Sequence, residues 1–180
     1  MPDFSVRRIR EDDWEQFRRL RLDALRTDPL AFGGTLARES TYLEGKWRSW
    51  CKDGTIGEQT ATFVATGPSG ELVGMVGAFT AEDTPHVWGM WTRPEWRLRG
   101  IGRRLMECLL DWTERSSAGR PVLLDVNPSQ AAAVSIYLGL GFRFSGVEAA
   151  LGHDSPAVVR QMVRQPGSKA GGRRGEGVLS

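Results

Sequence analysis

A strand-to-helix turn rich in glycine and arginine constrains this chain more than any other stretch. The segment from Trp88 to Leu110 reads WGMWTRPEWRLRGIGRRLMECLL: it starts as a strand, passes through a basic turn and continues as a helix. The turn has glycines at Gly100 and Gly102, and four arginines lie between Arg97 and Arg104. Glycine allows close backbone approach, and the start of a helix presents unpaired N–H groups to an anion. Arginine adds forked donors suited to phosphate. The stretch therefore predicts a pyrophosphate cradle, with a solvated glycine-rich helix start as the alternative.

The order of elements around this turn favours an α/β domain with a mixed, mainly antiparallel sheet and helices on both faces. Hydrophobic periodicity predicts both element types. Strands are expected at Phe4–Ile9, Thr60–Thr66, Leu72–Phe79, His86–Thr92, Pro121–Val126, Phe142–Val147 and Ala157–Val163. Helices are expected after Asp12 or Asp13 and over Tyr42–Lys52, Ile101–Arg115 and Gln130–Leu140, while Lys52–Gln59 is expected to be a loop. The Ile101–Arg115 helix then makes a right-handed parallel crossover between the strands that flank it.

Two motifs resemble a known family. Arg97-x-x-Gly100-x-Gly102 is similar to the Q/R-x-x-G-x-G/A signature of the GNAT acetyltransferases, and it lies in the required strand-turn-helix context. The segment from Gln130 to Phe142 resembles the second hallmark of that family, N-x-x-A-x-x-x-Y-x-x-x-G-F. Ala133, Tyr137, Gly141 and Phe142 match, whereas Gln130 replaces the usual asparagine. The resemblance is specific between Met90 and Phe142 and follows the element order over most of the chain.

This resemblance implies that acetyl-CoA is the cosubstrate and that it enters a groove between the His86–Thr92 strand and the strand after Pro121. The cradle would bind the pyrophosphate through backbone amides, the strand would pair with the pantetheine arm, and the later helix would flank that arm. The implied cofactor-binding residues are Met90, Trp91, Thr92, Arg97, Leu98, Arg99, Gly100, Ile101, Gly102, Arg103, Asn127, Gln130, Ala133 and Tyr137.

The resemblance also implies catalytic roles. Tyr137 is expected to be the general acid that protonates the departing thiolate, against the alternative of a core tyrosine with a satisfied hydroxyl. His86 lies near the place where many relatives carry a carboxylate base, and histidine titrates in the useful range. A solvent-facing His86 beside a turn is the alternative. Further base candidates are Glu39, Glu82, Asp83 and Asp154, and a structural role for Asp125 is as plausible as a catalytic one.

Composition limits the remaining classes. At 180 residues and 40% hydrophobic content, one domain over residues 1–164 is expected, followed by a disordered tail over residues 165–180 that is poor in apolar residues. The net charge of +2 gives no indication of a nucleic-acid partner. No stretch reaches the ~20 apolar residues of a membrane span. Cys51 and Cys108 have no metal-ligand spacing, so no metal site is expected, and a reducing cytoplasm suits two unpaired thiols.

The resemblance thus implies an N-acetyltransferase that moves an acetyl group from acetyl-CoA to a primary amine by direct attack in a ternary complex. A non-catalytic acyl-CoA-binding sensor is the main alternative. A dinucleotide-binding oxidoreductase would need a parallel βαβ unit before the turn, and a P-loop would need G-K-[ST]. The acceptor, a small molecule or a protein amine, stays open, as does the choice between monomer and homodimer.

Overall fold

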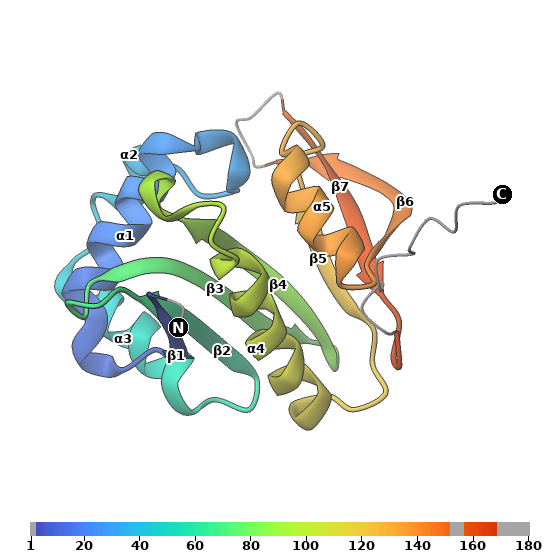
Figure 1. Ribbon diagram of the computed structural model, residues 1–180, viewed down its shortest axis with the longest axis horizontal. Coiled ribbons are helices and arrows are strands. Elements are labelled where there is room, and N and C mark those ends of the chain that lie inside the picture. The colour runs from blue at the N-terminus through green and yellow to red at the C-terminus, as the bar shows by residue number, and fades with distance from the viewer. Residues whose placement is uncertain (1–2, 152–156, 169–180) are drawn as a thin grey trace, which may run out of the picture.

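The computed structural model describes residues 3–151 and 157–168, and its elements follow the predicted order (Figure 1). The strands are β1 (Ser5–Arg8), β2 (Thr60–Thr66), β3 (Leu72–Ala81), β4 (Thr84–Thr92), β5 (Val122–Val126), β6 (Arg143–Ala150) and β7 (Val158–Arg164). The helices are α1 (Trp14–Thr27), α2 (Leu36–Glu39), α3 (Glu44–Ile56), α4 (Ile101–Ser116) and α5 (Ala131–Gly139). Short 3-10 turns occupy Glu11–Asp13, Pro29–Ala31 and Pro94–Trp96.

The sheet has the order β1-β2-β3-β4-β5-β7-β6, in which β4 and β5 are parallel and every other neighbouring pair is antiparallel. One hydrophobic cluster packs α4 and α5 against the sheet, with Leu105, Leu109 and Phe142 fully buried. A second cluster packs α1 and α3 against the sheet, around Phe17 and Trp47. The expected mixed sheet with helices on both faces is confirmed.

Helix α3 is longer than the sequence predicts. It continues to Ile56, so the prediction of a loop over Lys52–Gln59 is wrong for residues 52–56. The helix can continue because Gly54 lets it approach β2 closely: a Cβ on Gly54 would lie 2.7 Å from the Thr62 hydroxyl oxygen. The polar, glycine-containing sequence is typical of a loop, but here it serves helix packing.

The predicted tail falls mostly outside the described residues. Within the described part, residues 165–168 form a turn in which the Ser168 N–H donates to the Gln165 carbonyl at 3.2 Å. The loop that contains Asp154 also lies outside the described residues, so that base candidate has no structural account here.

Asp13 anchors the start of α1 to β1. Its carboxylate accepts hydrogen bonds from Arg7 Nη1 at 2.7 Å and Nη2 at 2.9 Å, and from the Arg10 N–H at 2.7 Å. Burial opposes ionisation of Asp13, but these donors outweigh it and lower its pKa below the ordinary aspartate value. A carboxyl whose pKa is lowered by folding stabilises the fold at neutral pH, and this contribution is lost as the pH falls through the lowered pKa.

We therefore expect Asp13→Asn to reduce the free energy of unfolding by about 1–3 kcal/mol at pH 7, because it leaves the half-buried Arg7 guanidinium without its full partner. Urea denaturation at pH 7, 5 and 3 checks this. The difference from the wild type should shrink toward pH 3, where the wild-type carboxyl starts to lose its own advantage. Asp12→Asn, at the exposed neighbouring position, is the matched control. An equal loss at all three pH values would show that the ionised carboxylate is not the stabilising group.

Candidate functional site

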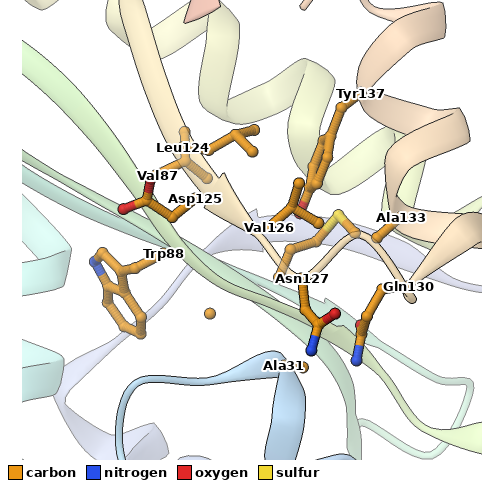
Figure 2. A pocket seen from close by; sticks show the side chains of 12 residues that line it. Ala31, Val87, Trp88, Leu124, Asp125, Val126, Asn127, Gln130, Ala133 and Tyr137 are labelled. Atoms are coloured by element: carbon orange, nitrogen blue, oxygen red, sulfur yellow. The ribbon is translucent and has the colours of Figure 1, made fainter. Parts of the chain in front are cut away.

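The parallel strands β4 and β5 separate and leave a cavity between them. They pair at His86–Leu123 and Val87–Leu124, whereas β5 stays paired with β7 as far as Val126. The predicted parting of these strands is thereby confirmed. The cavity is lined by Val87, Trp88, Gly89 and Met90 of β4, Leu124, Asp125, Val126 and Asn127 at the end of β5, Gln130, Ala133 and Tyr137 of the α5 segment, and Ala31 (Figure 2).

A β-bulge in β4 shapes one wall of this cavity. Trp88 pairs with Gly77 of β3, and Trp91 pairs with Met75. Two residues of β4 lie between these pairs where β3 has only one, so β4 carries one extra residue. Gly89 lies in the bulge with φ +67°, a left-handed conformation that favours glycine. Beyond Val87 the register shows no pairing of β4 with β5, so the β5-facing backbone of β4 has no strand partner among the described residues. Such an edge is available to an extended ligand.

Tyr137 projects from α5 into the cavity from the side opposite Trp88 (Figure 2). The side chain is almost fully buried, with its ring tilted against Phe142 at a centroid distance of 5.9 Å. Burial raises the Tyr137 pKa well above its ordinary value, so the phenol keeps its proton at neutral pH. Over residues 3–151 and 157–168 its hydroxyl has no hydrogen-bond partner. The Tyr137 hydroxyl therefore carries its proton and is free to donate a hydrogen bond to a ligand.

The segment predicted to be the cradle adopts the expected turn and helix start at the beginning of α4. Gly100 caps the helix with φ +82°, and the first bond into the helix runs from the Arg104 N–H to the Gly100 carbonyl at 3.0 Å. The N–H groups of Ile101, Gly102 and Arg103 have no acceptor in the described part of the chain. A Cβ on Gly102 would lie 3.2 Å from Ile136 Cδ1 and 3.8 Å from the Met90 sulfur. The cradle and the cavity therefore adjoin.

The arginines of the cradle are largely held by the protein itself. Arg97 binds Asp28 at 2.5 Å and donates from Nε to the Thr92 carbonyl at 3.1 Å. Arg99 stacks on Trp96 with its guanidinium carbon 4.7 Å from the ring centre, and Arg103 pairs with Glu107 at 3.0 Å. Leu98 is fully exposed, with φ +62°. The free backbone amides are thus the donors best placed for an anion, with the arginines as supporting charge.

The structure places the predicted site residues in three groups. Met90, Asn127, Gln130, Ala133 and Tyr137 line the cavity. The cradle residues Arg97, Leu98, Arg99, Gly100, Ile101, Gly102 and Arg103 lie beside it, and Thr92 leads into them. Trp91 turns away, is buried against α1 and donates from Nε1 to Asp28 at 2.7 Å.

His86 and the acidic candidates Glu39, Glu82 and Asp83 lie outside the cavity lining. His86 stacks on Phe79 with ring centres 5.3 Å apart, at the end of β4 where the pairing with β5 is intact. Glu82 and Asp83 form the β3–β4 turn, and Asp83 pairs with Arg120. Glu39 is buried in a two-bond pair with Arg21, at 2.9 and 2.8 Å. A base role for any of these would need a water relay to the cavity.

Two polar side chains of this region have positions that the sequence pattern does not predict. Asp125, for which an inward-facing structural role was the alternative to a catalytic one, is exposed and lines the cavity, so the inward-facing alternative is wrong. Arg21 is 5% exposed, and its Nη1 would lie 3.6 Å from a Cβ on Gly89. The signal for Arg21 was present in the sequence: it falls on the apolar stripe of α1 between Leu20 and Ala24, where an unpaired charge would be costly.

Both thiols have raised pKa values, which disfavour the reactive thiolate form. Burial raises the pKa of Cys51 to about 12, and burial likewise raises that of Cys108. Neither residue lines the cavity. The described residues contain no group of three or more His, Cys, Asp or Glu side chains arranged to hold a metal ion. Within the same part of the chain, no helix combines the length and the apolar character that crossing a membrane requires.

Comparison with known proteins agrees with this geometry. Residues 6–142 match the sequence model of the acetyltransferase (GNAT) family. The streptothricin acetyltransferase of Streptomyces lavendulae is 34% identical over 110 residues, a match that covers 56% of this chain and 54% of that protein. The chain thus spans about half the length of this relative.

Solved structures extend the likeness to the whole fold. A nourseothricin acetyltransferase superposes with a TM-score of 0.54 at 28% identity, over 59% of this chain and 65% of that one. A GNAT superfamily phosphinothricin acetyltransferase from Sinorhizobium meliloti, solved in complex with acetyl-CoA, superposes with a TM-score of 0.71 at 18% identity. That match covers 98% of this chain and 95% of the other.

Proposed function

This chain belongs to the acetyltransferase (GNAT) family, and we propose that it moves an acetyl group from acetyl-CoA to a primary amine of a small molecule, by direct attack in a ternary complex. The observation that carries the proposal is the hydroxyl of Tyr137 in the gap between β4 and β5, which is protonated and has no hydrogen-bond partner among the described residues. Two relatives, at 34% and 28% identity, are named as acetyltransferases of streptothricin and nourseothricin, which supports a small-molecule acceptor.

The residues of the cradle fit a pyrophosphate. The free N–H groups of Ile101, Gly102 and Arg103 supply donors at the positive end of α4, and Gly102 leaves the space that a side chain would fill. Arg99 and Arg103 would add positive charge. The open edge of β4 near Met90 would pair with the pantetheine arm, and Gln130 and Ala133 would border it. The bound cosubstrate supplies an activated acetyl thioester.

Tyr137 would act as the general acid. Its phenol would donate its proton to the departing sulfur, and a pKa raised by burial keeps that proton in place over the working pH range. A backbone N–H of the β4 bulge, near Met90, would polarise the thioester carbonyl. For the amine, His86 remains the proposed route for the leaving proton, through water, since its ring lies on β4 outside the cavity lining.

Direct attack is favoured over an acetylated enzyme. A covalent route would need a nucleophile in the cavity, and cysteine reacts as the thiolate. Cys51 and Cys108 have raised pKa values and lie outside the cavity lining, so neither supports such a route. The two unpaired thiols also suit the proposed cytoplasmic location.

The test is CoA release with a panel of amines. We expect purified protein with acetyl-CoA to liberate free thiol only when an amine is added, with streptothricin and nourseothricin among the first acceptors to try. Mass spectrometry of the acceptor should show the mass of one acetyl group added. Tight acetyl-CoA binding without amine-dependent thiol release, across small amines and peptides, would favour a non-catalytic sensor instead.

A further inference from the structure

We propose that Asp125 and Trp88 form a recognition site for a second positive charge on the acceptor, so that the preferred acceptors are diamines or polyamines. The proposal rests on the function proposed above and names the class of acceptor. Val87 and Leu124 are the last paired residues of β4 and β5, and Trp88 and Asp125 follow them on the two strands as these separate. Both line the cavity, and Figure 2 shows them across it from Tyr137.

The carboxylate of Asp125 is uncompensated. It is exposed, and across the described ranges it forms no ion pair or hydrogen bond through its side chain. Its partner on β7 is the neutral Gln161. The buried cation on this side of β4, Arg21, is paired with Glu39 through Nε and Nη2, while its Nη1 has no hydrogen-bond partner in the described part of the chain. Arg21 lies below the cavity wall and is 5% exposed, whereas the carboxylate of Asp125 is exposed and is the group that a cationic ligand would pair with.

Trp88 adds an aromatic surface in a fixed position. Its ring lies against Gly77, where a Cβ would come within 2.2 Å of the indole. On the helix side it packs on Trp50 with ring centres 5.3 Å apart, and Trp50 stacks on Trp47. Trp88 is nevertheless only partly buried and lines the cavity, and indole is the best aromatic for contact with a cation. A carboxylate beside an indole is suited to an alkylammonium group.

The reacting nitrogen itself is a poor occupant for this site. An amine must be neutral to attack, and a neighbouring carboxylate favours the charged ammonium form. The group that Asp125 and Trp88 bind should therefore be a second nitrogen of the acceptor, which stays positively charged throughout the reaction. The reacting amine is then left free to approach the β4 bulge and Tyr137.

The experiment compares cadaverine, which has two amines, with hexylamine, which has a methyl group in place of the second one. For the wild type we expect kcat/KM to favour cadaverine by roughly 10-fold or more, the scale of one carboxylate contact plus one cation–π contact. The preference should collapse in Asp125→Asn and weaken in Trp88→Leu. Asp111→Asn removes the same charge from an exposed position on α4 and should retain it.

Calorimetric titration of cadaverine into the CoA-loaded protein gives a readout that does not depend on turnover. We expect Asp125→Asn to weaken binding by a similar factor, while thermal melts confirm that each variant is folded. Equal use of both amines by the wild type, survival of the preference in Asp125→Asn, or no measurable cadaverine binding would each overturn the proposal. If cadaverine binds through Asp125 but no amine is acetylated, the recognition site stands and the proposed activity fails.

Discussion

A Gly102→Glu variant should lose acetyl-CoA binding while it keeps its fold. Position 102 is the second residue of α4, where free N–H groups meet the end of the cavity. A glutamate there brings a side chain and a negative charge to the place proposed for the pyrophosphate. Two charge-assisted hydrogen bonds lost at about 1.5–3 kcal/mol each correspond to a drop in affinity of roughly 100-fold or more.

Calorimetry with acetyl-CoA measures this loss, and Gly45→Glu provides the matched control. Gly45 lies in the first turn of α3, exposed, with no atom within 4 Å of an added Cβ. The control should bind acetyl-CoA like the wild type. A Cβ on Gly102 needs Ile136 to shift by a few tenths of an ångström, so a small drop in melting temperature is expected. Unchanged affinity in a folded Gly102→Glu protein would refute the cradle.

Tyr137→Phe should separate catalysis from binding. The change removes one hydroxyl and almost no volume, and that hydroxyl has no partner among the described residues whose loss would cost stability. We expect acetyl-CoA affinity to hold, while kcat falls by roughly 10- to 1000-fold, the usual range for losing a general acid. Single-turnover kinetics with an acceptor from the amine panel would measure the effect on the chemical step.

The chain offers a matched control for this change, because its other tyrosine is Tyr42. That hydroxyl accepts from Arg38 Nε at 3.1 Å and lies away from the cavity, so Tyr42→Phe should retain full kcat. If Tyr137→Phe turned over at the wild-type rate, the thiolate would have to leave unprotonated or take its proton from water. A loss of stability with kcat intact would instead identify a purely structural tyrosine.

The parts of the site that local signals encode were predictable. Glycine at positions 100 and 102 and the start of an amphipathic helix specify the cradle within a few residues, and the backbone there adopts the expected conformation. The strand limits of β2 agree with the periodicity to the residue. The motif from Gln130 to Phe142 predicted Tyr137 as a site residue, and Tyr137 lines the cavity.

The remaining features depend on contacts between distant segments. An apolar strand such as Val122–Val126 gives no indication of which side chain faces the gap, so the exposed position of Asp125 at the cavity follows only from the separation of β4 and β5. The distance of His86 from the cavity depends on where that pairing stops. Arg21 is buried because Glu39, in another helix, neutralises it. Hydrophobic periodicity does not predict such contacts between distant segments.

The most direct test is a crystal structure of the protein with CoA. We expect the pyrophosphate on the amides of Ile101, Gly102 and Arg103, the pantetheine arm along the open edge of β4, and the sulfur within hydrogen-bond reach of the Tyr137 hydroxyl. CoA bound outside the gap between β4 and β5, or with its sulfur far from Tyr137, would contradict this expectation.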